Sequence, residues 1–179
     1  YILLQDYADG AEIYVTTDKF SSTTKLNEPN DADNGISATD FTRNQSGYDL
    51  EIETDPNNEN IVYVGGINLF RSSDGGTNWT RVLGHSKNSM ATNQNGSGTQ
   101  NYITGYFYVN DIVIWDSDHN SNPDNTIIFA ALGASFNNEE DSGILTFMGL
   151  YSYGLYKSTD NGDNWTRVSD LVLSVVKIL

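Results

Sequence analysis

Short apolar runs alternate with polar, turn-forming segments along the whole chain. Typical runs are Ile61–Gly65 and Thr126–Leu132, and Asn, Asp, Ser, Thr and Gly residues crowd the segments between them. No stretch of useful length carries apolar residues at the 3.6-residue period of an amphipathic helix. The chain is also rich in aromatic residues, with 11 Tyr, 7 Phe and 3 Trp, which strands favour. The pattern predicts an all-β fold of many short strands joined by turns.

One segment of this pattern occurs twice without gaps. Leu69–Val82 and Leu155–Val168 align residue for residue and share the motif S-x-D-x-G-x-x-W. A third, degenerate copy lies at Ile13–Phe20, where Asp18 and the preceding strand are kept but the Gly and Trp are absent. The motif residues are Ser72, Asp74, Gly76, Trp79, Ser158, Asp160, Gly162 and Trp165.

The residue types of the motif predict a β-hairpin. A short Asp carboxylate such as that of Asp74 can accept hydrogen bonds from free backbone N–H groups in the turn. Gly76 permits a positive φ, and Trp79 at the start of the returning strand can cover the hairpin as a local hydrophobic plug. We therefore interpret Asp74 and Asp160 as structural residues of a self-contained hairpin.

These residues resemble the Asp-box, or bacterial neuraminidase, repeat. The flanking segments Thr54–Gly66 and Asn122–Ala134 are similar to the run that precedes the box in such repeats. The repeat marks sialidases, xyloglucanase-type glycoside hydrolases, sortilin-type receptors, photosystem assembly factors and secreted bacterial surface proteins. The resemblance implies a β-propeller segment made of about three four-stranded antiparallel blades, but it does not fix the function.

The expected blades follow from this resemblance. We assign residues 1–44 to a partial first blade, 45–84 to a second blade, 85–110 to an insertion, 111–170 to a third blade with an inserted loop at 135–154, and 171–179 to the first strand of a next blade. The expected strands of the second and third blades are Tyr48–Thr54, Ile61–Gly65, Leu69–Ser73, Asn78–Leu83, Asp111–Asp116, Thr126–Leu132, Leu155–Thr159 and Asn164–Val168. The first blade is expected to hold Tyr1–Tyr7, Glu12–Thr17 and an outer strand near Ile36–Thr42, and Leu173–Leu179 to begin a fourth blade. We expect the chain to be a portion of a longer polypeptide, with the remainder of the propeller elsewhere.

Both insertions are expected on one rim of the propeller. In an antiparallel blade, the connection from strand two to strand three and the connection to the next blade share one face, whereas the Asp boxes mark the other. Long loops gathered on one rim commonly form binding surfaces. The aromatic side chains that we expect there as a candidate ligand face are Tyr102, Tyr106, Tyr108, Phe136, Phe147, Tyr151 and Tyr153. Flat aromatic rings can stack on sugars or anchor protein partners, although Tyr106 and Tyr108 could equally form one inward face of an extra strand.

The net charge of −15 and the absence of Cys narrow the partners and the chemistry. A negative field repels nucleic acid and anionic membrane surfaces, and no apolar run is long enough for a membrane span. Thiolate metal sites and Cys nucleophiles are excluded. The one candidate metal is Ca²⁺ at Asp116, Asp118 and Asn120, with a shorter Asp31–Gly35 stretch as a second candidate; alternating Asp and Asn residues also simply make good turns.

No complete active site is recognisable. A sialidase needs a cluster of three Arg, but only Arg43, Arg71, Arg81 and Arg167 are present, three of them in or beside the hairpins. A glycoside hydrolase needs two carboxylates across a cleft. The best-placed acid is Asp111, near Glu139–Asp141, but no pair stands out.

We therefore expect a non-catalytic binding or scaffold segment of an exported, secreted or cell-surface protein, although no export signal is visible. Its partner would be a glycan or a protein, without a cofactor. The alternative is a fragment of a sialidase-like or xyloglucanase-like glycoside hydrolase whose catalytic residues lie elsewhere. An intracellular assembly-factor propeller is disfavoured by the surface composition.

Overall fold

The described part of the chain consists of strands and turns. The computed structural model describes residues 1–6, 10–31, 41–42, 46–47, 50–83, 106–116, 126–135, 146–147, 150–151, 154–168 and 178. Within these residues there is no helix. The all-β class expected from the sequence is confirmed.

Three antiparallel sheets follow one another along the chain, and we call them the first, second and third blades. The first blade contains β1 (Ile2–Asp6), β2 (Gly10–Val15) and β3 (Thr24–Lys25). The second contains β4 (Glu51–Thr54), β5 (Val62–Gly65), β6 (Leu69–Ser72) and β7 (Thr80–Leu83). The third contains β8 (Tyr106–Asp116), β9 (Thr126–Ser135), β12 (Gly154–Ser158) and β13 (Thr166–Arg167), and a two-stranded ribbon of β10 (Thr146–Phe147) and β11 (Leu150–Tyr151) is inserted between β9 and β12. Within each blade the strands pair in chain order, so each blade is a simple meander.

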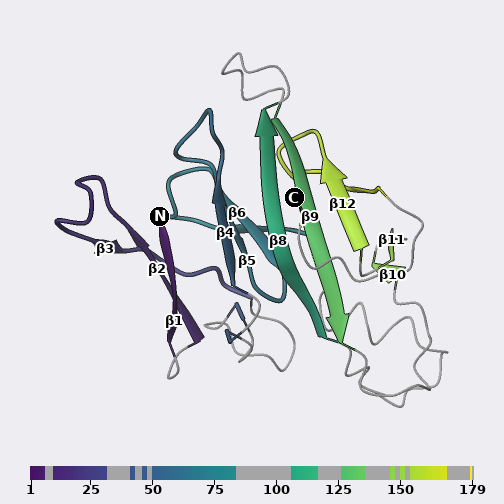
Figure 1. Ribbon diagram of the computed structural model, residues 1–179, viewed down its shortest axis with the longest axis horizontal. Helices are drawn as coiled ribbons and strands as arrows, with labels where there is room; N and C mark the ends of the chain where they lie inside the picture. The colour runs from purple at the N-terminus through teal and green to yellow at the C-terminus, as the bar shows by residue number, and fades with distance from the viewer. Residues whose placement is uncertain are drawn as a thin grey trace.

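The blades are stacked side by side in chain order, from the first at the left of Figure 1 to the third at the right. Their contacts are made near the first strands, since β4 contacts β8 and β1 contacts β4. Sheets that meet at their first strands and succeed one another in this way form a β-propeller segment. The fold class expected from the sequence is therefore confirmed, with three strands described in the first blade and four in each of the others.

Each gap between blades is filled by an apolar cluster. Alternate residues of β5 point to opposite faces of its sheet, so Tyr63 packs toward the third blade and Val64 toward the first. All four residues of β5 are buried, because the middle blade is covered on both faces. The Phe70 ring meets the Phe41 ring edge-on, at a centroid distance of 6.4 Å and an interplanar angle of 81°.

The second and third blades approach very closely at one glycine. A Cβ built on Gly65 would lie 2.7 Å from both Cβ and Cγ1 of Val109, which is closer than real side chains come. The N–H of Val109 donates to the carbonyl of Gly66 at 2.8 Å. The glycine therefore lets two backbones from different blades come within hydrogen-bonding distance.

The strand that follows β2 in the first blade is β3, at Thr24–Lys25, directly after the degenerate third motif, and it was not among the expected strands. Of the outer strand expected near Ile36–Thr42, residues 36–40 lie outside the described residues, and Phe41 and Thr42 are buried in a turn. The reason is that the turn at Asp18 closes the hairpin locally, so the following residues pair at once with β2.

Other strands differ from expectation at their ends. β8 begins at Tyr106 and β9 continues to Ser135, so both extend further than expected, across a bulge between Val109 and Asp111. β7 and β13 begin two residues later than expected, because the hairpin turn continues to Asn78 and Asn164. Of the expected strand Leu173–Leu179, only Ile178 lies within the described residues, and the domain boundaries remain predictions.

Candidate functional site

Two of the described turns contain the same hydrogen-bonded cradle. We call residues Ser72–Asn78 hairpin 2 and residues Ser158–Asn164 hairpin 3. In hairpin 2 the Ser72 hydroxyl donates to Asp74 Oδ1 at 2.9 Å and accepts the N–H of Gly76 at 2.8 Å. Asp74 in turn accepts the backbone N–H of Asn78 at 2.8 Å and its side-chain amide at 2.7 Å.

Hairpin 3 repeats every one of these contacts. The Ser158 hydroxyl joins Asp160 Oδ1 and the N–H of Gly162, each at 2.8 Å. Asp160 accepts the backbone and side-chain N–H groups of Asn164 at 2.9 and 2.7 Å. Since the hydroxyl and the carboxylate satisfy the free N–H groups of the turn, the hairpin is closed by local residues alone.

The degenerate copy forms the same cradle with different residues, and we call Thr16–Ser22 hairpin 1. The Thr16 hydroxyl donates to Asp18 Oδ1 at 3.0 Å and accepts the N–H of Phe20 at 3.1 Å. Asp18 accepts the backbone N–H and the hydroxyl of Ser22 at 2.9 and 2.7 Å. Thr therefore replaces Ser, and Ser replaces Asn, with these four hydrogen bonds kept. The spacing T-x-D-x-x-x-S was the sequence signal that could have identified this hairpin in full.

The backbone of the three turns is also alike. Gly76 and Gly162 have φ values of 89° and 87°, in the left-handed region that glycine tolerates. Phe20, at the equivalent position of hairpin 1, has a φ of 68° and its side chain is 71% exposed. A bulky residue in this conformation is uncommon, and the cradle hydrogen bonds hold it there.

Hydrogen bonds lower the pKa of each hairpin carboxylate. For Asp74 and Asp160 the largest cause is the side-chain amide of the Asn four residues later, followed by its backbone N–H. For Asp18 the largest cause is the hydroxyl of Ser22. These aspartates are ionised, and each carboxylate accepts three hydrogen bonds from its own hairpin, which suits a structural role.

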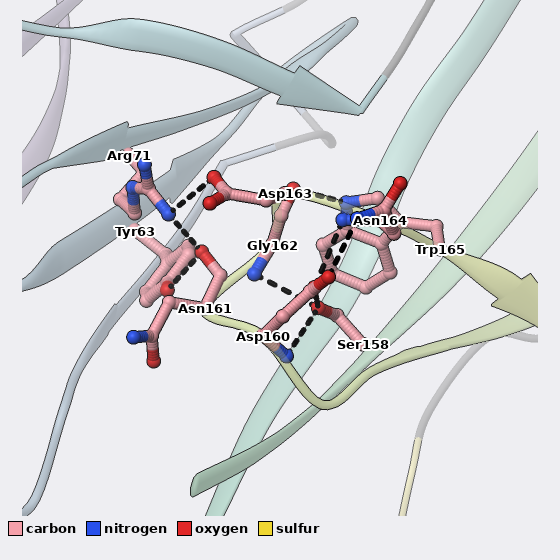
Figure 2. Close-up of polar contacts among 9 residues, drawn as sticks. All are labelled: Tyr63, Arg71, Ser158, Asp160, Asn161, Gly162, Asp163, Asn164 and Trp165. Carbon is pink, nitrogen blue, oxygen red and sulfur yellow. Dashed lines mark hydrogen bonds and ion pairs between the residues drawn. The ribbon is translucent and has the colours of Figure 1, made fainter. Parts of the chain in front are cut away.

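Hairpin 3 also fastens the third blade to the second, as Figure 2 shows. The Tyr63 hydroxyl of β5 donates to the carbonyl of Asn161 at 2.9 Å, and Arg71 of β6 donates to the same oxygen. Arg71 Nη1 also lies 3.0 Å from Asp163 Oδ1. Burial is the main cause that raises the pKa of Tyr63, so this phenol stays protonated and can donate. The hairpin is thus more than the self-contained unit that its motif suggests.

Hairpin 2 fastens the second blade to the first in the same manner. The indole N–H of Trp79 donates to the carbonyl of Asn27 at 2.8 Å, and the Asn27 side chain donates to the carbonyl of Thr77 at 2.9 Å. By contrast, the Trp165 indole donates to the carbonyl of Gly162 in its own hairpin, at 2.8 Å. The two tryptophans therefore share a position but differ in what they hold.

The ends of the sheets opposite the hairpins carry the two insertions. β7 ends at Leu83, which pairs with Leu69 at the end of β6 far from Ser72. β8 begins at Tyr106, opposite Ser135, and β12 begins at Gly154. The connections 84–105 and 136–153 therefore leave from one end of the blades, and the hairpins close the other.

The candidate ligand-face residues are only partly described. Tyr106 and Tyr108 belong to β8, whereas Phe147 and Tyr151 belong to β10 and β11 of the inserted ribbon. The other members of this set, Tyr102, Phe136 and Tyr153, lie outside the described residues. The backbone thus places Tyr106 and Tyr108 in the first part of β8, and the ligand face remains a prediction.

Acidic residues meet where the second and third blades touch. Burial, and secondarily the Asp111 carboxylate of β8, raises the pKa of Glu53 of β4 above its ordinary 4.5. Asp111 is 3% exposed and its Oδ2 accepts the N–H of Ile178 at 2.6 Å. This carboxylate, the best-placed acid of the sequence, is therefore buried and hydrogen-bonded and not open to solvent.

The candidate metal ligands are only partly described. Asp116 ends β8, and Asp118 and Asn120 lie outside the described residues. Asp31, from the second candidate stretch, accepts the Asn68 side-chain amide at 2.9 Å and lies 3.4 Å from Arg81. No group of three His, Asp or Glu residues that could hold a metal occurs among the described residues, and the Ca²⁺ site remains a prediction. The same residues contain no helix able to cross a membrane.

Two of the arginines considered for a carboxylate-binding cluster have separate partners. Arg71 pairs with Asp163 of the third blade, and Arg81 pairs with Asp31 from the segment after β3. Arg167 lies in β13, and Arg43 is outside the described residues. The contacts of Tyr63, Arg71 and Arg81 were not foreseen, since nothing in their local sequence indicates a partner in another blade.

Comparison with known proteins identifies similar structures but no family. No family model and no curated protein matches the sequence. Among solved structures, a GH74 enzyme from Niastella koreensis is 21% identical, with a TM-score of 0.46 over 89% of this chain and 18% of that chain. An ancestral GH74 enzyme is 16% identical, with a TM-score of 0.44 over 92% of this chain and 16% of that chain. The chain thus spans less than a fifth of either enzyme.

Proposed function

We propose that this chain is a non-catalytic binding or scaffold segment of a propeller in an exported protein, secreted or at the cell surface. The observation that carries the proposal is that the two ends of the blades differ. The Ser, Asp and Gly residues of the hairpins use their polar groups on one another at one end, whereas both long connections leave from the other end. Loops on a rigid β scaffold are the usual place for a binding surface.

The chemistry of the partner follows from the residues carried at that end. Four of the aromatic residues that we propose for this face belong to strands: Tyr106, Tyr108, Phe147 and Tyr151. Aromatic rings suit the apolar faces of sugar rings or the core of a protein interface. A glycan or protein partner is consistent with the net charge of −15, which opposes nucleic acid and anionic membranes.

A glycoside hydrolase fragment is the second candidate, and one observation favours it. Glu53 has a raised pKa beside Asp111, as a general acid beside a second carboxylate would. Against this, Asp111 is 3% exposed and is held by the N–H of Ile178. A catalytic carboxylate must reach a water molecule or a sugar, so we prefer the binding function.

The binding proposal is tested with the full chain on a glycan array and against β-glucan polysaccharides in solution. We expect binding that Tyr151→Ala or Phe147→Ala weakens. The matched control is Trp115→Ala, which removes a 49% exposed aromatic ring near the hairpin end of β8. Equal loss in all three variants, or no binding to any glycan or extracellular protein, would contradict the proposed face.

The same samples separate the two candidates. A binding segment releases no reducing sugar from any polysaccharide that it binds. Release of sugar that Glu53→Gln abolishes would instead support the hydrolase fragment.

A further inference from the structure

The surface that receives each hairpin is repeated from blade to blade. We number each repeat from the first Ser or Thr of its hairpin, which is position 1, and continue the count into the strand that follows. A hairpin contacts the residue at position 11 of the blade before it. This residue is Leu26 in the first blade and Val82 in the second. A Cβ built on Gly76 would lie 2.6 Å from Leu26 Cδ1, and one built on Gly162 would lie 3.5 Å from Val82 Cβ. Each hairpin glycine thus rests on the position 11 side chain of the blade before it.

The second part of the receiving surface is a pair of opposite residues on the two middle strands. In the second blade these are Tyr63 and Arg71, which pair directly in register and bind Asn161 and Asp163 of hairpin 3. Arg71 immediately precedes position 1 of its own hairpin. An acid at position 6 of the docked hairpin, here Asp163, therefore meets a cation at this place. In the first blade the equivalent residue is Val15, and position 6 of hairpin 2 is correspondingly the uncharged Thr77.

The third blade has the same surface. Its position 11 residue is Val168, whose N–H donates to the carbonyl of Leu155 at 2.8 Å, as the N–H of Leu26 does to Ile13 in the first blade. Its opposite pair on the middle strands is Phe129 and Lys157, again in direct register. The surface thus combines an aliphatic side chain, an aromatic ring and a cation.

This third surface is uncovered within the part of the chain that the structure describes. Val168 is 49% exposed, although its equivalents Leu26 and Val82 are partly buried. Phe129 is also partly exposed, whereas its equivalent Tyr63 is 0% exposed beneath hairpin 3. Val82 and Tyr63 would be exposed in the same way if hairpin 3 were removed from the second blade.

We infer that Val168, Phe129 and Lys157 form a docking surface for a fourth Asp hairpin, supplied by a further blade. The docked hairpin has Gly at position 5, which permits the close approach to Val168, and Asp or Glu at position 6, which pairs with Lys157. The two occupied surfaces in the same chain define this geometry. It lies apart from the ligand face of the proposed function and does not depend on it.

Hairpin 1 of a second copy does not meet these requirements. Position 5 is Phe20, whose ring stands where a glycine must approach, and position 6 is the uncharged Ser21. Position 8 is Thr23, where hairpins 2 and 3 have Trp. Head-to-tail association of the natural chain through hairpin 1 is therefore disfavoured, and these three differences show how to create it.

The test converts hairpin 1 into a suitable probe. A donor chain carries F20G, S21D and T23W, together with V168D to block its own docking surface, and the acceptor is the unchanged full chain. Sedimentation velocity of the mixture is expected to show a one-to-one complex, and the acceptor alone a monomer. Val168→Asp or Lys157→Glu in the acceptor should weaken association by about tenfold or more, the effect of losing one central contact.

The controls distinguish docking from general stickiness. Leu4→Asp removes a side chain of almost the same exposure, 48%, and should leave association unchanged. A donor with Lys in place of Asp at position 21 should recover binding to the Lys157→Glu acceptor. Circular dichroism confirms that every variant is folded.

Three results would overturn the inference. The first is no association of folded donor and acceptor. The second is equal weakening by Leu4→Asp and Val168→Asp. The third is self-association of the natural chain that Val168→Asp abolishes, because a second copy would then be the occupant.

Discussion

Removing one hydroxyl tests whether the hairpin cradle holds a blade together. In Ser72→Ala the N–H of Gly76, which is buried and bonded to Ser72 at 2.8 Å, loses its acceptor. The same change removes a 2.9 Å bond to Asp74 Oδ1. Leaving a buried donor without a partner costs about 1–3 kcal/mol of unfolding free energy.

The neighbouring residue provides a matched control. Ser73→Ala makes the same chemical change at an exposed position, so it should alter the free energy of unfolding by no more than about 0.5 kcal/mol. Unfolding in urea, followed by circular dichroism and Trp fluorescence, measures both variants. For a chain of this size 1 kcal/mol corresponds to about 2–4 °C, so Ser72→Ala should melt about 2–12 °C lower. Hydrogen exchange at the Gly76 amide should also accelerate.

The comparison can refute the reasoning directly. If Ser72→Ala and Ser73→Ala have the same unfolding free energy within error, water or a backbone shift replaces the hydroxyl. The cradle would then describe the shape of the turn and not a source of its stability.

Three further predictions concern the contacts between blades and the hairpin carboxylates. A double-mutant cycle of Arg71→Met and Asp163→Asn, measured by urea unfolding, should give a coupling of about 0.2–1 kcal/mol, because Asp163 is 64% exposed; zero coupling would remove the ion pair from the interface. Gly65→Ala should destabilise by about 1–3 kcal/mol, since its Cβ would overlap Val109, and unchanged stability would disprove the close approach. Hydrogen bonds lower the pKa of Asp160, so they stabilise the folded protein above the ordinary pKa of 3.8, and this stabilisation is lost as the pH falls through the folded-state pKa. Asp160→Asn should therefore make the free energy of unfolding less dependent on pH in acid, and an unchanged pH dependence would contradict this.

The parts of the fold that the sequence predicted well are those made by neighbouring residues. The hairpins at Asp74 and Asp160 could be expected because their hydrogen bonds join residues four positions apart or fewer. The opposite placement of the insertions followed from antiparallel order alone. The strand β3 was missed because the degenerate copy at Asp18 lacks the Gly and Trp of the motif, although the Thr16 hydroxyl and the Asp18 carboxylate suffice to close the turn.

The candidate site was less predictable, because its contacts join residues that are far apart in the sequence. Asp111 was considered the best-placed acid for a catalytic carboxylate, but packing of the third blade against the second buries it. Asp31 was considered as a metal ligand, whereas Asn68 and Arg81 use its carboxylate. Burial and pairing of an acid depend on what the rest of the chain brings beside it.

The sequence by itself determined an all-β chain with repeated Asp hairpins, because alternating polarity and short-range hydrogen bonds act within a few residues. Only the tertiary structure decided what the hairpins hold. Tyr63 and Asn161 are 98 positions apart and Trp79 and Asn27 are 52 apart, yet each pair forms one hydrogen bond. Such contacts exist only after the blades have packed, because burial of apolar side chains between sheets supplies the free energy that brings distant segments together.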